Sequence, residues 1–79
     1  MKINEFDSIL PFKIQDLVSL IIEIKNINFE EAVQFLYESK LYEALSDEQT
    51  KLWHLSSEKL LDMLLIEETT GTLIFPDFV

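Results

Sequence analysis

The chain contains three acid-rich helix starts, Asn28-Phe29-Glu30-Glu31, Ser46-Asp47-Glu48-Gln49 and Ser56-Ser57-Glu58. Each opens with a short polar side chain whose oxygen can accept hydrogen bonds from the free amides of a first helical turn. The carboxylates that follow favour the positive end of a helix dipole. Because folding already accounts for these polar residues, the sequence predicts a helical protein and carries no catalytic or ligand-binding signature between the starts.

Apolar residues repeat with helical spacing in the segments around these starts. After Pro11, whose missing amide proton costs little in a first helical turn, the repeat runs through Leu17, Val18 and Ile21 as one stripe. A short helix or turn is expected over residues 41–45, and another short helix over about 47–53. The three principal helices are expected over about 11–25, 29–40 and 57–68.

The 79 residues suit a single domain, and 48% of them are apolar. Six Phe, two Tyr and one Trp add large areas to a core. We expect residues 1–79 to form one all-α domain, a small bundle of three principal helices with one or two short helices. Thr69-Thr70-Gly71 should end the last helix. Residues 72–79 should form an extended tail, which either packs on the helices or pairs with residues 2–6.

The chain is strongly acidic, with fifteen acidic residues, six lysines and no arginine, for a net charge of −9. Nucleic-acid binding requires neutralised phosphates and favours arginine for reading base edges, so this class of function is disfavoured. Anionic membrane surfaces are disfavoured for the same reason. If the chain has a partner, a basic protein fits this charge best.

Cysteine is absent, which excludes disulfide bonds and thiolate metal sites. The first residues contain no apolar core of signal-peptide length. The densest apolar stretch, residues 17–24, is interrupted by Ser19 and Glu23 and is far shorter than the roughly 20 residues of a membrane-spanning helix. We therefore expect a soluble, cytoplasmic protein.

Three motifs carry a resemblance to a known group of proteins. They are Phe29-Glu30-Glu31-Ala32 with Phe35-Leu36-Tyr37, then Ser39-Lys40-Leu41-Tyr42, and then Thr50-Lys51-Leu52-Trp53-His54. Over roughly residues 14–66 the chain resembles small uncharacterised bacterial helical proteins. The resemblance implies a small helical domain and no activity, since these proteins are known mainly as domains of unknown function. Some of them are suspected of regulating a neighbouring gene product.

His54 is the single imidazole of the chain and therefore the first candidate for a general base or a metal ligand. The residues three and four positions before it are Lys51 and Thr50, so no acid lies at a helical spacing that would orient the ring. No Gly-flanked serine and no Gly-rich phosphate loop occurs. We expect no enzymatic activity, no cofactor and no metal. A minor enzyme or a metal site around His54 is the alternative.

Several residues are candidates for a protein interface. Tryptophan is enriched among interface hot spots, but we expect Trp53 to be a core residue between the short helix and the last long one, with an interface anchor as the alternative. Glu67 and Glu68 lie at the negative end of a helix, where carboxylates are mildly unfavourable. Side chains of the first helix widen its apolar stripe, which is typical of a central helix or of contact with a second subunit. The candidate interface residues are Trp53, His54, Glu67, Glu68, Leu20, Ile22 and Phe78.

The charge, the apolar surfaces and the missing catalytic motifs together predict a non-enzymatic, acidic protein-binding module. Its partner would be a basic protein or a second copy of the chain, the latter forming a homodimer through the first helix. The alternative is an antitoxin-like or regulatory protein that neutralises the product of a neighbouring gene.

Overall fold

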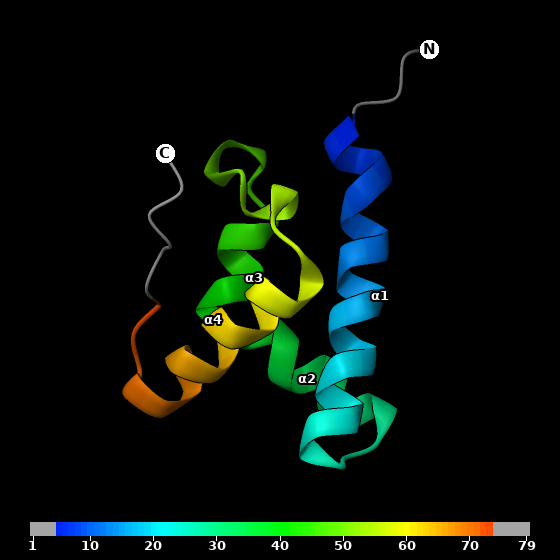
Figure 1. The fold of residues 1–79 in the computed structure, drawn as a ribbon, viewed down its shortest axis with the longest axis vertical. Coiled ribbons are helices and arrows are strands. Elements are labelled where there is room, and N and C mark those ends of the chain that lie inside the picture. Colours follow the sequence, from blue (N-terminus) through cyan, green and yellow to red (C-terminus); the bar gives the residue numbers. More distant parts are fainter. Residues whose placement is uncertain (1–4, 74–79) are drawn as a thin grey trace.

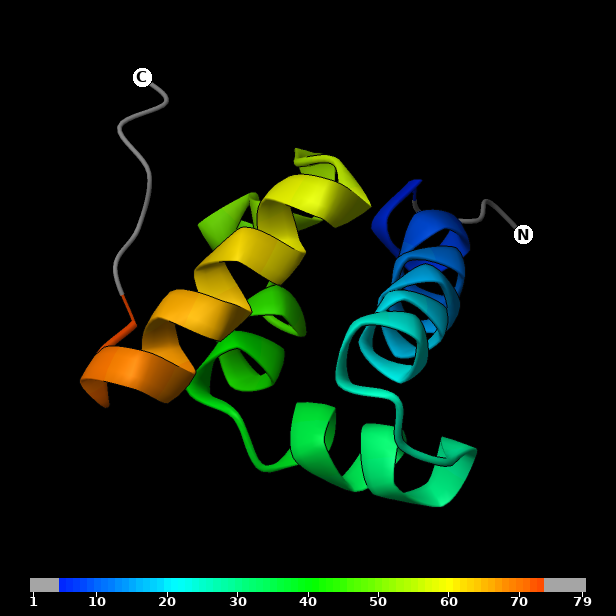
Figure 2. The same ribbon diagram turned by 60° about the horizontal axis from the view of Figure 1, so that its bottom comes forward.

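The computed structural model describes residues 5–73, and within them it contains four α-helices, two short 3₁₀ turns and no strand. The all-α prediction is confirmed. Three helices are long, α1 (Glu5–Lys25), α2 (Phe29–Tyr37) and α4 (Ser57–Thr70), and α3 (Lys40–Leu45) is short. In Figure 1, α1 stands along one side of the molecule and α3 and α4 lie on the other. Figure 2 shows α2 crossing between the end of α1 and the start of α3.

Helix α1 begins at Glu5, so the predicted start at Pro11 is wrong. Proline inside a helix removes one hydrogen bond, here the bond to the carbonyl of Asp7. Asp7 is exposed in the first turn, where water can satisfy that carbonyl. Phe6 and Leu10 pack against the core, and their burial extends the helix through the proline.

Helix α2 starts with the predicted capping box. The N–H of Glu31 donates to Asn28 Oδ1 at 2.8 Å, and the N–H of Asn28 donates to Glu31 Oε1 at 3.2 Å. The helix ends at Tyr37, so the predicted end at residue 40 is wrong. The hydroxyl of Ser39 donates to the carbonyl of Leu36 and accepts from the N–H of Tyr42, which stops α2 and starts α3 over the segment predicted as a short helix or turn.

The predicted helix over residues 47–53 is wrong, because two 3₁₀ turns occupy this segment. They are η1 (Glu48–Thr50) and η2 (Leu52–His54), and Lys51 between them has a left-handed backbone with φ of 63°. The hydroxyl of Thr50 donates to the carbonyl of Ala44 at 2.7 Å. This bond turns the chain back toward α3 and competes with a continuous helix.

Helix α4 has the predicted cap and stop. The hydroxyl of Ser56 accepts from the N–H of Lys59 at 3.1 Å. Gly71, with φ of 77°, ends the helix and donates to the carbonyl of Glu67 at 2.7 Å. Glycine adopts this left-handed conformation without steric cost. The helix therefore runs two residues beyond its predicted end.

The core lies between α1 and the other helices. Thirteen buried apolar side chains form it, and among the described residues Ser57 is the buried polar one. Every described α-helix contributes at least two of these residues, so the core joins all four helices. The core residues are Leu17, Val18, Ile21, Ala32, Leu36, Leu41, Leu45, Leu52, Trp53, Leu60, Leu61, Met63 and Leu64.

The predicted pairing of the tail with residues 2–6 is wrong for Glu5 and Phe6, because both belong to the first turn of α1. Residues 2–4 and 74–79, including Phe78, lie outside the described part of the chain. Of the predicted tail 72–79, the structure describes Thr72 and Leu73. Leu73 is half-buried and packs against the core.

Candidate functional site

His54 lies at the exposed end of η2, against the ring of Trp53. The two ring centroids are 4.0 Å apart, with the planes tilted by 33°. Trp53 is 4% exposed, its Nε1 donates to the carbonyl of Glu48 at 3.0 Å, and Phe6 meets its ring edge-on at 5.5 Å. Trp53 is therefore a core side chain, as expected, and the alternative of an interface anchor does not fit its burial. Within residues 5–73, no three His, Asp or Glu side chains gather closely enough to hold a metal ion.

Glu67 and Glu68 connect α4 to other helices. Glu67 accepts hydrogen bonds from the N–H of Lys40 at 2.8 Å and from the N–H of Leu41 at 3.0 Å. These amides open α3 and have no partner within their own helix, so a carboxylate from α4 caps α3. Glu68 forms an ion pair with Lys25 of α1 at 2.7 Å. The acids that look unfavourable at the end of α4 are thus part of the tertiary structure.

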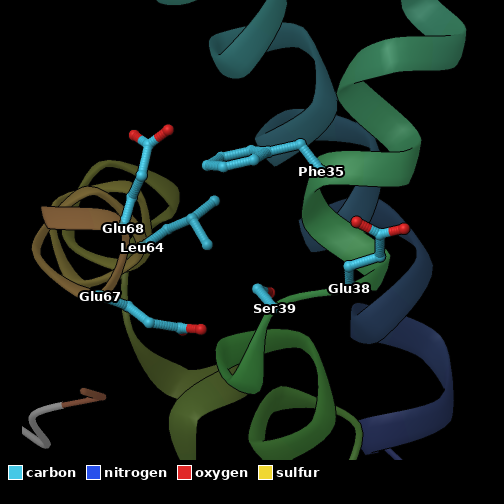
Figure 3. A pocket seen from close by; sticks show the side chains of 6 residues that line it. All are labelled: Phe35, Glu38, Ser39, Leu64, Glu67 and Glu68. Atoms are coloured by element: carbon cyan, nitrogen blue, oxygen red, sulfur yellow. The ribbon is translucent and has the colours of Figure 1, made fainter. Parts of the chain in front are cut away.

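A hollow of about 220 Å³ lies beside this acid pair. Figure 3 shows Phe35 and Leu64 closing the space between α2 and α4, with the Glu67 side chain directed toward Ser39. The polar side chains around it already have partners. Glu38 accepts from Gln34 at 3.1 Å, and the Nζ of Lys25 lies 4.7 Å from the centroid of the Phe35 ring. The hollow is a gap between two packed helices, and the polar groups around it already interact with other residues of the chain.

A second, larger groove of about 390 Å³ separates the outer sides of α1 and α2. None of its nine lining residues carries a charge, although 27% of the chain is charged. Phe29 is 64% exposed and Tyr37 is 51% exposed. The Tyr37 ring stacks on Tyr42 at 4.5 Å, which holds this wall in place. The lining residues are Pro11, Ile14, Gln15, Val18, Ser19, Ile22, Phe29, Val33 and Tyr37.

The rim of this groove is acidic. Residues three or four apart are neighbours on a helix surface, so Glu23 flanks Ser19 on α1, and Glu30 flanks Val33 on α2. Both acids are exposed. Helix α2 contains no base, and α1 contains only Lys13 and Lys25.

Neither lysine of α1 neutralises this rim. Lys25 is paired with Glu68. Lys13 is two residues from both Pro11 and Gln15, a spacing that places it on the opposite face of α1. The groove therefore has an uncharged floor between carboxylates, and we call it the α1–α2 groove.

The structure places the predicted residues of α1 on two different sides of that helix. Leu20 and Ile22 are half-buried against the core. Ile22 lines the α1–α2 groove, whereas Leu20 lies in a crevice with Ser57 of α4. The wide apolar stripe of α1 is thus explained by its central position between α2 and α4.

Sequence reasoning missed the aromatic wall of the groove. Phe29 lies three and four residues before Ala32 and Val33, a spacing that suggests an inner-face position, yet its side chain is 64% exposed. The signal was present, because Phe29, Val33 and Tyr37 recur every four residues and form their own stripe along α2. That stripe lies beside the buried stripe of Ala32 and Leu36.

Comparison with protein-family models, with curated proteins and with solved structures finds no match for this chain. The resemblance over residues 14–66 therefore stays a prediction. No helix in the described part of the chain is long and apolar enough to cross a membrane.

Proposed function

We propose that this chain is a non-enzymatic protein-binding module whose α1–α2 groove binds a basic partner protein. The observation that carries the proposal is the uncharged lining of the groove in a chain with a net charge of −9. Apolar surface rimmed by polar residues is typical of interaction sites. Two of the five exposed large apolar side chains of the described residues line this groove, namely Phe29 and Tyr37.

The energetics support a protein partner. Covering the exposed part of one such aromatic ring contributes roughly 2–3 kcal/mol before the entropy cost of association. Two such rings in one groove therefore favour a specific but reversible contact. Charge supports a basic partner over a second copy, because another copy would bring nine further negative charges to an acidic rim.

Affinity purification from the source cells tests this proposal with three versions of the chain: wild type, Phe29→Ser and Ile66→Ser. Both substitutions remove an exposed apolar side chain without changing the charge, and Ile66 is 44% exposed on α4, outside the groove. We expect a protein rich in Lys and Arg to be retained by wild type and by Ile66→Ser and to be lost with Phe29→Ser. Equal retention by all three versions contradicts the proposal. The proposal is also contradicted if light scattering shows that the wild type is a homodimer and that Phe29→Ser is a monomer.

A further inference from the structure

The length of the α1–α2 groove matches two turns of a helix. The lining residues run from Pro11 to Ile22 on α1 and from Phe29 to Tyr37 on α2. At 1.5 Å per residue, these walls are roughly 18 Å and 13 Å long. Side chains at positions i, i+4 and i+7 of a helix span about 10 Å, so three anchors of one helix face fit within the shorter wall.

In the described residues, a bound peptide would contact side chains of the groove and not a row of backbone N–H and C=O groups. Residues 5–73 contain no strand, so no sheet edge is present to which an extended peptide could add. The aliphatic floor of Ile14, Val18 and Ile22 and the aromatic wall of Phe29 and Tyr37 are surfaces for apolar anchors. A helix meets this requirement because its own backbone hydrogen bonds are satisfied internally.

The acidic residues at the rim of the groove favour basic residues on both sides of the apolar stripe of such a helix. Glu23 lies on the outer side of one wall, and Glu30 lies on the outer side of the other. On the basis of the function above, we propose that the occupant is an amphipathic helix of the partner protein. Its apolar stripe enters the groove, and Lys or Arg residues beside the stripe face Glu23 and Glu30.

Three synthetic 18-residue peptides test this inference. The first has leucines at helical i, i+3, i+4 and i+7 positions and lysines elsewhere. The second has the same composition in an order that spreads the leucines around the helix, and the third replaces every lysine of the first by glutamate. Binding to the full chain is measured by fluorescence anisotropy, and backbone amide shifts measured by NMR locate the site.

We expect the amphipathic basic peptide to bind about tenfold or more tightly than either of the others, with amide shifts along α1 and α2. Phe29→Ser should weaken this binding about tenfold, as the loss of one aromatic anchor would, while Ile66→Ser should leave it unchanged. Because both variants keep the charge of the wild type, attraction between opposite charges alone cannot produce this difference.

Equal binding of the two basic peptides overturns the inference, as does a site away from α1 and α2 or an effect of Phe29→Ser no larger than that of Ile66→Ser. If the peptides fail while Phe29→Ser still releases a basic partner in the affinity purification, the helical occupant is wrong and the proposed function stands. Failure of both experiments rejects both proposals.

Discussion

The hollow between α2 and α4 and the α1–α2 groove differ in what covers their aromatic rings. In the hollow between α2 and α4, Lys25 lies over the Phe35 ring and pairs with Glu68, while Glu67 caps α3. In the α1–α2 groove, Phe29 is 64% exposed and no charged side chain lines the surface. The first hollow is occupied by interactions of the chain with itself, and the second is open to a partner.

This difference shows that an acidic cluster and an apolar groove must be judged by their existing partners. The carboxylates of Glu67 and Glu68 stand out in the sequence but are used to join helices. The uncharged residues of the groove stand out less in the sequence, yet they present apolar area to solvent. Substitutions around the first hollow should therefore change stability, and substitutions in the groove should change binding.

The largest effect is expected from Leu64→Ala at the hollow between α2 and α4. Leu64 is 1% exposed, and its truncation leaves a cavity in the core, so the free energy of unfolding should fall by about 2–5 kcal/mol. Urea denaturation followed by circular dichroism measures this change. The half-buried Leu65 is the matched control, and Leu65→Ala should cost less. A loss below about 1 kcal/mol for Leu64→Ala would show that this hollow is not tightly packed.

The adjacent acids Glu67 and Glu68 should differ in their contribution to stability. Glu67→Ala leaves the amides of Lys40 and Leu41 without their carboxylate, which should cost about 1–2 kcal/mol. Glu68→Ala breaks a partly exposed ion pair with Lys25 and should cost less than about 1 kcal/mol. The same denaturation experiment compares both variants. Equal losses would mean that the cap on α3 contributes no more than a surface ion pair.

The capping box of α2 positions the aromatic wall of the groove, so Asn28→Ala should affect both stability and binding. Loss of the Asn28 oxygen removes the acceptor for the N–H of Glu31 and should cost about 1 kcal/mol. Asn28→Asp keeps an acceptor oxygen and serves as the control. The capping account is rejected if thermal unfolding midpoints of the two variants are the same.

The smallest change in stability is expected for Phe29→Ser. Because the ring is mostly exposed, its removal should change the free energy of unfolding by less than about 0.5 kcal/mol. Its effect on binding of the amphipathic basic peptide should nevertheless be the largest of these variants. A destabilisation above about 1.5 kcal/mol would indicate that Phe29 stabilises the fold, and the contrast between the two hollows would fail.

Most of the helices could be predicted because their signals are local. The capping box of Asn28 and Glu31, the cap of Ser56 and the left-handed Gly71 each depend on residues within one turn. Pro11 was misread for the same reason, because local preference places proline at a helix start. Burial of Phe6 and Leu10 against the core extends α1 across it.

The segment after α3 could not be predicted from local spacing. Helical periodicity over residues 47–53 is real, but the bond from Thr50 to the carbonyl of Ala44 and the left-handed Lys51 fold the chain into two turns. The roles of Glu67 and Glu68 depend on residues 26 to 43 positions away. No periodicity within one helix reports such contacts.

The sequence by itself determined where α2 and α4 begin, which stripes are apolar and that the surface is acidic, because these properties follow from neighbouring residues along one helix. The tertiary structure alone decided which apolar stripes are covered. Helix α1 has one face packed on α2 and another on α4, so the four-residue stripe of Phe29, Val33 and Tyr37 borders a groove instead of the core. Whether an apolar stripe is buried depends on the angles at which the helices cross, and these angles are set by the packing of all the core side chains.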